Sequence, residues 1–195
     1  AIDAVEAWFA ERRRTAVFQI FDETHSDVAV ALHGRGYEQG SVVDVVSGPL
    51  ATALGRAASG VTMVSDVSDT MPDFLTDRLS AARAVEMQAS TLPQWFATAS
   101  IDGVAVGGGM AIGDGELVGV FAMRTDPSHQ GRGAGAAVFA SLLERGAATG
   151  ARTVWLQVES SNRRAGDWYR RLGLTRRTGY RYLRRPSISS SHSDA

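Results

Sequence analysis

The stretch QGRGAG, residues 130–135, places three glycines in six positions directly before an apolar segment, AAVFASLLERGA. Glycine loses more backbone entropy on folding than any other residue, so three of them in an ordered segment need a structural reason. A helix N-terminus supplies one, because its first N–H groups lack intrahelical partners and the helix dipole is positive there. Glycines would let a diphosphate approach that backbone closely, so the stretch predicts an anion-binding loop at the start of a helix.

Two other interpretations fit the same glycines. Gly131, Gly133 and Ala136 match G-x-G-x-x-A, the dinucleotide fingerprint, and Glu159 ends the next predicted strand, where a ribose-binding acid would lie. Against this, TDPSHQ separates the preceding strand from the first glycine, and that strand belongs to an antiparallel meander. The remaining interpretation is a glycine-rich turn that allows close packing of helix and strand.

Composition narrows the class of protein. The chain has 195 residues, of which 44% are hydrophobic, so we expect one domain, or one domain with a partial second. A net charge of −1 predicts no nucleic-acid or membrane partner. There is no cysteine, no apolar run of membrane-spanning length and no signal peptide, so we expect a cytoplasmic protein. No His/Asp cluster has the spacing of a metal site, so no metal is expected.

Hydrophobic periodicity and turn residues divide the chain into helices and strands. Asp102-Gly103 and Asp114-Gly115 are hairpin dipeptides, so 94–125 reads as a β-meander. Residues 48–60 fit either a linker or a weak helix. We predict helices at 2–13, 26–36, 69–88 (broken near Pro72), 132–150 and 163–173, and further strands at 16–21, 41–46, 61–67, 152–159 and 178–185.

An internal similarity appears when Gly36 is aligned with Gly173, a shift of 137 residues. AVFQIFDETHSDVAVALHGRGY then falls on TVWLQVESSNRRAGDWYRRLGL, strand on strand and helix on helix. Identities are few, but the matched order of elements favours an old duplication with a partial N-terminal copy.

The loop and its surroundings resemble the GNAT acetyltransferase superfamily over about residues 61–185. Gln130 to Gly135 match the signature Q/R-x-x-G-x-G/A, and Met123-Arg124-Thr125 followed by Asp126-Pro127 match the strand and turn before it. Downstream, Asn162, Tyr169 and Leu172-Gly173-Leu174 match the family's strand–Asn–helix–Tyr–L-G-F pattern. The resemblance implies an α/β (α+β) GNAT fold: a mixed, mostly antiparallel twisted sheet flanked by helices, here preceded by a partial GNAT-like lobe.

The resemblance also implies acetyl-CoA as cosubstrate and assigns residues to it. Backbone groups of Met123 and Thr125, with Arg124 between them, would hydrogen-bond the pantetheine arm, and Asn162 would contact it. Met123 also fits a core residue, and Asn162 a helix cap. The diphosphate would lie on the loop, whose residues are Gln130, Gly131, Arg132, Gly133, Ala134 and Gly135; Arg132 can add charge-assisted hydrogen bonds.

Tyr169 matches the tyrosine that returns a proton to the CoA thiolate as it leaves, although a core aromatic beside Trp168 is the alternative. A phenol is protonated at neutral pH, which suits a general acid. The general base stays unassigned, because the family's glutamate positions fall on Gly119 and Gln157. Glu159, Glu116 and a water relay to backbone carbonyls are the alternatives.

These inferences divide the chain into a partial, degenerate lobe with linker (1–60), a GNAT domain (61–185) and a disordered, serine-rich tail (186–195). Leu32 falls on Tyr169 and His25 on Asn162 at the 137-residue shift, so the N-terminal copy is not expected to catalyse. It would cover the sheet or line the acceptor site, and we expect a monomer or a homodimer.

The sequence therefore favours an acyl-CoA-dependent N-acyltransferase that moves an acetyl group to a primary amine of a small molecule or peptide. Trp95, Phe96 and Trp168 are candidates for an aromatic acceptor pocket, or are core residues. A non-catalytic acyl-CoA-binding or regulatory module is the second class, since the standard glutamates are missing. A nicotinamide-dependent oxidoreductase is the third.

Overall fold

The structure, a computed structural model, describes residues 1–21, 23–59, 63, 65–76 and 91–186. Its centre is one eight-stranded sheet in the order β1-β8-β2-β7-β6-β5-β4-β3. All neighbouring strands are antiparallel except β6 and β7, which are parallel. The strands are β1 (Val17–Phe21), β2 (Glu38–Pro49), β3 (Ser65–Ser68), β4 (Gln94–Ile101), β5 (Val104–Asp114), β6 (Leu117–Thr125), β7 (Thr153–Glu159) and β8 (Thr175–Arg184).

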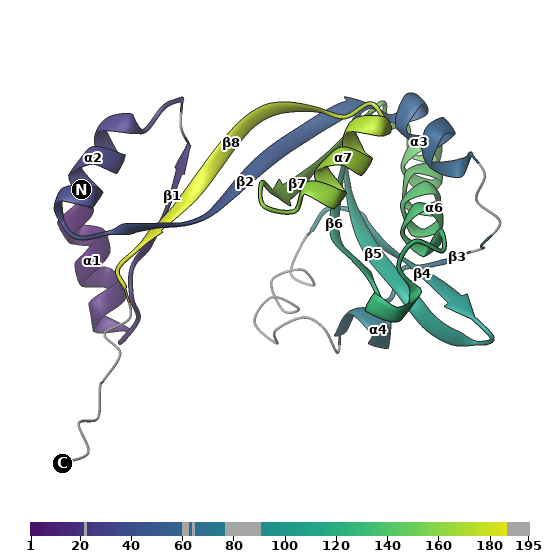
Figure 1. The fold of residues 1–195 in the computed structure, drawn as a ribbon, viewed down its shortest axis with the longest axis horizontal. Coiled ribbons are helices and arrows are strands. Elements are labelled where there is room, and N and C mark those ends of the chain that lie inside the picture. The colour runs from purple at the N-terminus through teal and green to yellow at the C-terminus, as the bar shows by residue number, and fades with distance from the viewer. Residues whose placement is uncertain (22, 60–62, 64, 77–90, 187–195) are drawn as a thin grey trace, which may run out of the picture.

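Helices lie at both ends of this sheet, as Figure 1 shows. They are α1 (Ile2–Glu11), α2 (Ser26–Gly34), α3 (Leu50–Ala58), α4 (Asp73–Thr76), α6 (Ala134–Ala148) and α7 (Arg163–Arg171), with a 3₁₀ turn at Pro127–His129. The mixed, mostly antiparallel sheet flanked by helices confirms the predicted fold class. Of the predicted helix at 69–88, α4 is the part within the described residues, and 77–90 lie outside them. Of the predicted strand at 61–67, residues 65–67 belong to β3, Met63 is not in a strand, and 61, 62 and 64 lie outside the described residues.

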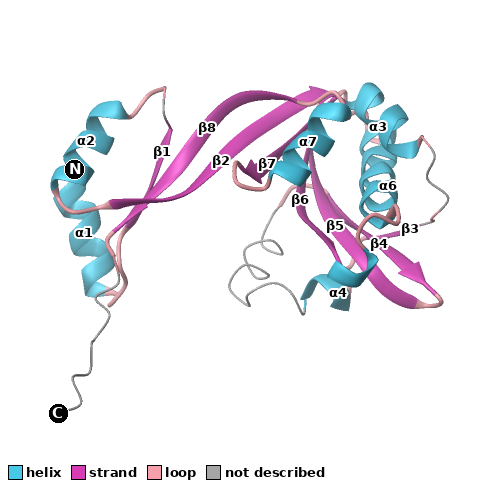
Figure 2. Cartoon of the chain, in the orientation of Figure 1, coloured by secondary structure: helices cyan, strands magenta, loops and turns pink. Residues whose placement is uncertain are grey.

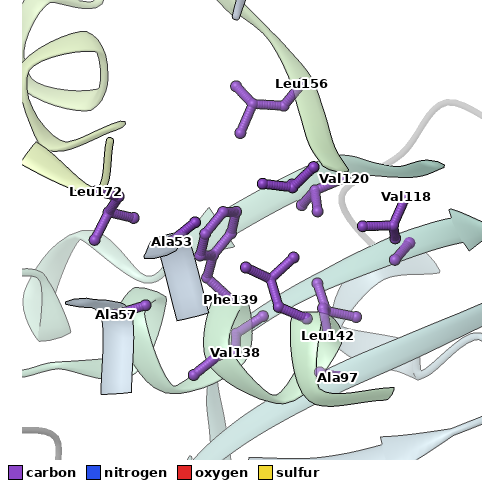
Figure 3. Packing of buried hydrophobic residues seen from close by; sticks show 14 of the residues in the cluster. Ala53, Ala57, Ala97, Val118, Val120, Val138, Phe139, Leu142, Leu156 and Leu172 are labelled. Carbon is purple, nitrogen blue, oxygen red and sulfur yellow. The ribbon is translucent and has the colours of Figure 1, made fainter. Parts of the chain in front are cut away.

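Residues 50–58 form a helix rather than the linker that the sequence also allowed. Leu50, Ala53 and Ala57 are almost fully buried, at 2, 0 and 2% exposure. Their spacing places them on one face of α3, which packs in the main core with Phe139, Leu142 and Leu143 of α6 (Figure 3). Alanines on that face allow the two helices to approach closely. The helix was hard to predict because the segment is weakly hydrophobic on average, although its apolar residues share one face.

The two faces of the sheet are covered by different helices at the meander. A Cβ atom on Gly109 would lie 3.1 Å from Val138 of α6, whereas one on Gly108 would lie 2.9 Å from Phe74 of α4. Since successive strand residues point to opposite faces, α6 and α4 lie on opposite sides of β5. Gly107, Gly108 and Gly109 of β5 are therefore explained by close helix packing on both faces.

Strand β2 crosses from the end of the molecule that holds α1 and α2 to the end that holds α6 and α7, and β8 crosses back (Figure 1). Figures 1 and 2 show the two strands as a long twisted ribbon between the two groups of helices. As a result, β2 lies between β8 and β7, and β8 lies between β1 and β2. Leu183 of β8 is fully buried in the small core formed with Ile20, Leu32 and Tyr37. Each end of the sheet therefore depends on a strand from the other half.

The 137-residue similarity extends to the element boundaries. Shifted by 137 residues, α2 (Ser26–Gly34) coincides with α7 (Arg163–Arg171), and β2 begins where β8 begins, at Thr175. The same shift places the end of α1, Glu11, on the end of α6, Ala148. Val43 of β2 pairs with Tyr180 of β8, and the shift of 137 residues also aligns Val43 with Tyr180. A local two-fold axis therefore passes between Val43 and Tyr180.

Strands β6 and β7 separate part of the way along their length. Their parallel pairing runs from Leu117 and Thr153 to Val120 and Leu156 and then stops. At this point β6 carries a register shift against β5, and Ala122 adopts a left-handed conformation with φ of 52°. Such a bulge bends a strand away from its neighbour. It opens the sheet between Phe121–Thr125 and the end of β7.

We expect Ala122→Val to destabilise the protein by about 1–3 kcal/mol, because a β-branched residue is strained at positive φ. Ala122→Gly is the control, since glycine adopts this conformation freely and should change the free energy of unfolding by less than about 1 kcal/mol. Urea denaturation of both variants measures the difference. Equal stability of the two would show that residue 122 does not hold the bulge.

Candidate active site

A cavity of about 410 Å³ opens where β6 leaves β7. Its wall is formed by the end of β6, the loop before α6 and one face of α7. The lining residues include three arginines, Arg124, Arg164 and Arg171, and no aspartate or glutamate. The cavity therefore suits an anionic ligand. Its lining residues are Met123, Arg124, Thr125, Gln130, Gly131, Gly133, Ala134, Gly135, Ala136, Asn162, Arg164, Ala165, Trp168, Tyr169 and Arg171.

The structure brings together all but one of the site residues predicted from sequence. Arg132 is the exception: it is exposed on the loop but does not line the cavity. The loop reaches the cavity as a bare backbone because Gly131 and Gly133 have φ of 82° and 93°, a region that favours glycine. Gly133 directly precedes α6, so the first N–H groups of a 15-residue helix begin there.

Asn162 both caps a helix and lines the cavity. Its Oδ1 accepts a hydrogen bond of 3.1 Å from the N–H of Ala165, which satisfies one unpaired donor at the start of α7. The cap fixes the first turn of α7 against the end of β7. The helical face that follows then carries Ala165 and Tyr169, one turn apart, into the cavity.

Tyr169 is 7% exposed and is held by aromatic neighbours. Its ring centroid lies 5.8 Å from that of Phe139 and 4.9 Å from that of Trp168. Burial raises the pKa of the Tyr169 phenol from 10.0 to about 12, since the phenolate would lose its hydration. Tyr169 is therefore fully protonated at neutral pH, while its position in the cavity wall lets it meet a ligand.

Neither glutamate position of the family carries a carboxylate. Space at Gly119 is filled: a Cβ atom there would lie 2.8 Å from the Phe121 ring and 2.9 Å from Trp155. Those two rings pack edge to face, with centroids 5.2 Å apart. Gln157 is exposed, and its Oε1 accepts a hydrogen bond of 3.2 Å from the Tyr180 hydroxyl. A glutamate at 119 would require these aromatic side chains to move.

Glu159 and Glu116, the two alternative candidates for the general base, lie at different distances from the cavity. Glu159 is exposed at the end of β7, on the side where β6 and β7 have separated. Glu116 precedes β6, nine residues before Thr125, so it lies roughly 30 Å away along an extended strand. It pairs there with Arg152, at 3.4 Å, on the surface. The structure therefore separates Glu116 from the cavity.

The aromatic acceptor pocket suggested by sequence is not formed. Trp95 and Phe96 are both 2% exposed. Trp95 donates a hydrogen bond of 3.0 Å to the carbonyl of Leu142 in α6, and Phe96 packs with Phe74 and Leu75 on the opposite face. Trp95 and Phe96 are therefore core residues, which was the alternative to the acceptor pocket in the sequence analysis. Trp168 lines the cavity beside Tyr169.

Sequence reasoning did not identify Arg164, Ala165 and Arg171 as site residues. The signal that could have found them is the helical period, because residues 164, 168 and 171 share one face of α7 with the predicted Tyr169 close by. Among the described residues, no group of three or more histidine, aspartate or glutamate side chains could hold a metal ion. No helix in the same residues could span a membrane.

Comparison with known proteins agrees with this fold. The model of the Acetyltransferase (GNAT) family matches residues 63–174, more than half of the chain. The fold and the site thus define an acetyltransferase-type protein. The chain belongs to the GNAT acetyltransferase family. Membership of this family argues against the third function class, a nicotinamide-dependent oxidoreductase.

Solved structures share the fold at low sequence identity. A GCN5-related N-acetyltransferase from Kribbella flavida is 19% identical with a TM-score of 0.70, over 96% of this chain and 74% of that one. A conserved protein of unknown function from Staphylococcus epidermidis is 14% identical with a TM-score of 0.70, over 96% and 79%. A tandem GNAT protein from the clavulanic acid biosynthesis pathway is 15% identical with a TM-score of 0.68, over 91% and 67%. No curated protein matches the sequence.

The raised pKa of Tyr169 predicts a loss of stability at alkaline pH. In the unfolded chain the phenol ionises from about pH 10, whereas in the folded protein it stays protonated until about pH 12. The unfolded state therefore binds fewer protons between these values, and stability falls as pH rises. This phenol should account for about 1.4 kcal/mol of loss between pH 8 and pH 11.

Urea denaturation of wild type and Tyr169→Phe at pH 8 and pH 11 measures that loss, because phenylalanine keeps the ring and cannot ionise. The wild type should lose more stability than the variant over this range. Parallel losses in both proteins would contradict the burial of an intact phenol.

Proposed function

We propose that this protein is an acyl-CoA-dependent N-acyltransferase that transfers the acetyl group of acetyl-CoA to a primary amine. One observation carries the proposal: a single cavity joins a glycine loop at a helix N-terminus, the free edge of a split sheet and a buried tyrosine, with no carboxylate in its lining. Membership of the GNAT acetyltransferase family supports the same chemistry. The acceptor would be a small molecule or a peptide amine.

The cavity residues divide between the parts of the cosubstrate. The diphosphate would lie on the loop from Gln130 to Gly135, where bare amides and the positive end of the α6 dipole meet it. The pantetheine arm would run along the free edge of β6, hydrogen-bonded to the backbone of Met123 and Thr125. Asn162 would contact this arm with the amide group that its capping bond leaves available.

The proposed reaction is direct attack. The amine nitrogen bonds to the thioester carbonyl carbon, and backbone N–H groups stabilise the oxyanion of the tetrahedral intermediate. Its collapse breaks the carbon–sulfur bond, and Tyr169 donates its phenolic proton to the departing thiolate. The amine proton leaves through Glu159 or a water relay to backbone carbonyls. Gln157 cannot take it, since an amide is not a base at neutral pH.

We further propose that residues 1–60 are a partial, degenerate GNAT-like lobe with its linker, that 61–185 are the catalytic domain, and that 186–195 are a separate tail, of which 187–195 lie outside the described residues. The coincident element boundaries and the Val43–Tyr180 pairing support a duplication. A tandem GNAT protein among the structures of similar fold supports it as well. The lobe would take the place of a second subunit, which favours a monomer, and a homodimer is the alternative.

The composition of the whole chain, which lacks cysteine, suits a cytoplasmic protein.

A non-catalytic acyl-CoA-binding or regulatory module is the second candidate. The absence of carboxylates at Gly119 and Gln157 favours it. Release of CoA thiol from acetyl-CoA, measured over a panel of amines and peptides, separates the two. Turnover with any amine supports the enzyme, whereas acetyl-CoA binding without turnover on the whole panel supports the module.

On an accepted amine, Tyr169→Phe should lower kcat by about 10²–10⁴-fold and leave the KM for acetyl-CoA close to wild type. The reason is that the phenolic proton acts in the transition state, while the ring and its packing are unchanged. Tyr182→Phe, which removes a hydroxyl from the ribbon strand β8, is the control and should keep full activity. Turnover of Tyr169→Phe within a few-fold of wild type would make Tyr169 a packing residue.

A further inference from the structure

Arg164 lies where an arginine costs helix stability. It is in the first turn of α7, which contains no acidic residue, and Arg163 precedes it. The positive end of a helix dipole disfavours cations at that position. Of the two arginines in this turn only Arg164 lines the cavity, where a negative ligand would compensate for the cost.

No carboxylate of the described chain plays that part. Every ion pair described for α7 involves Arg170, which meets Asp167 at 2.8 Å on the outer surface. Arg164 instead donates one hydrogen bond, 2.7 Å long, from Nη1 to Oε1 of Gln130. A neutral amide oxygen fixes the direction of a guanidinium without neutralising its charge.

The second edge of the guanidinium lies over the glycine loop. Nη2 is 3.8 Å from the point where a Cβ atom would stand on Gly131, the first glycine of the loop, and Arg164 lines the same cavity as the loop. The contact with Gln130 joins α7 to the loop, and both side chains line the cavity. A group on the loop amides would therefore have loop backbone on one side and a guanidinium on the other.

We propose that Arg164 binds the diphosphate of the acyl-CoA from the side opposite the loop, and that Gln130 is the residue that positions it. This inference rests on the proposed function, because it assumes that an acyl-CoA occupies the cavity. A planar guanidinium matches phosphate oxygens with two parallel N–H donors. Since Gln130 already holds the side chain, little rotamer entropy is lost on binding.

The position of the Arg164 guanidinium favours binding to the diphosphate of CoA over binding to its 3′-phosphate. The guanidinium is fixed beside Gly131, within the loop that offers the backbone amides. Arg171 lies seven residues further along α7, about 10 Å along the helix axis, and so faces another part of the cavity. Arg164 and the loop thus form one subsite.

Isothermal titration calorimetry with CoA and with dephospho-CoA, which keeps the diphosphate and lacks the 3′-phosphate, tests the proposal. Arg164→Gln should weaken both ligands equally, by about 10- to 100-fold, the effect of losing a charge-assisted hydrogen bond. Arg163→Gln is the matched control: it removes the same charge from the neighbouring exposed residue, which does not line the cavity, and should bind both ligands like wild type.

Gln130→Ala tests the positioning role. It should weaken both ligands, and the Gln130→Ala/Arg164→Gln double variant should be no weaker than Arg164→Gln alone, because Gln130 would act through Arg164. Because Arg164 is exposed and opposes the helix dipole, its variant should melt at the wild-type temperature or slightly above it, so a loss of affinity would not reflect a loss of folding.

The outcomes distinguish this inference from the proposed function. Wild-type affinity of Arg164→Gln for both ligands, or a loss for CoA without one for dephospho-CoA, overturns the assignment of Arg164 and leaves the acyltransferase proposal standing. Failure of the wild type to bind CoA at all overturns both. Additive losses in the double variant overturn the role of Gln130 alone.

Discussion

The separation of β6 from β7 is the constraint on which the site depends. Parallel pairing ends at Val120 and Leu156, so the backbone groups of Phe121–Thr125 that face β7 lose their strand partner. Unpaired backbone donors and acceptors are costly when they are buried, and they must be met by water or by a ligand. A pantetheine arm, with its own amides, is a ligand of suitable chemistry. Residue 122, held at positive φ, maintains this opening from within β6.

The core holds the two sides of the opening at a fixed distance. Helix α6 packs under β4, β5 and β6 with Val138, Phe139 and Leu142 fully buried. Phe139 also contacts Tyr169 and Trp168, so the helix that begins at the glycine loop supports the tyrosine at the other end of the cavity. Helix α3 packs against α6 in the same core. Loop and tyrosine are therefore positioned by the same helix.

Sequence patterns predicted the helices and strands well where the information was local. The hairpin dipeptides, the glycine loop and the apolar period of α6 each specify a short segment, and the structure has them close to the predicted residues. The α3 segment was ambiguous because its buried face consists mainly of alanines. The tyrosine, the loop and β6 meet in one cavity as the family motif implied.

Long-range pairing was not readable from the sequence. The pairing of β2 with β8 joins residues 128 to 146 positions apart, and no local pattern in either strand identifies its partner strand. The filled space at Gly119 depends in the same way on Phe121 and Trp155, which come from two strands. Arg164 was not predicted because the hydrogen bond that directs its side chain to the loop, to Gln130, joins residues 34 positions apart. Such features follow from tertiary packing, which local patterns do not encode.

The central claim is that the loop from Gly131 to Gly135 holds the diphosphate of an acyl-CoA whose thioester reaches the gap between β6 and β7. A crystal structure with acetyl-CoA tests it most directly. The account predicts diphosphate oxygens accepting hydrogen bonds from the loop N–H groups, and the thioester sulfur within hydrogen-bond reach of the Tyr169 hydroxyl. A diphosphate bound away from the loop, or a thioester on the far side of the sheet from Tyr169, would contradict it.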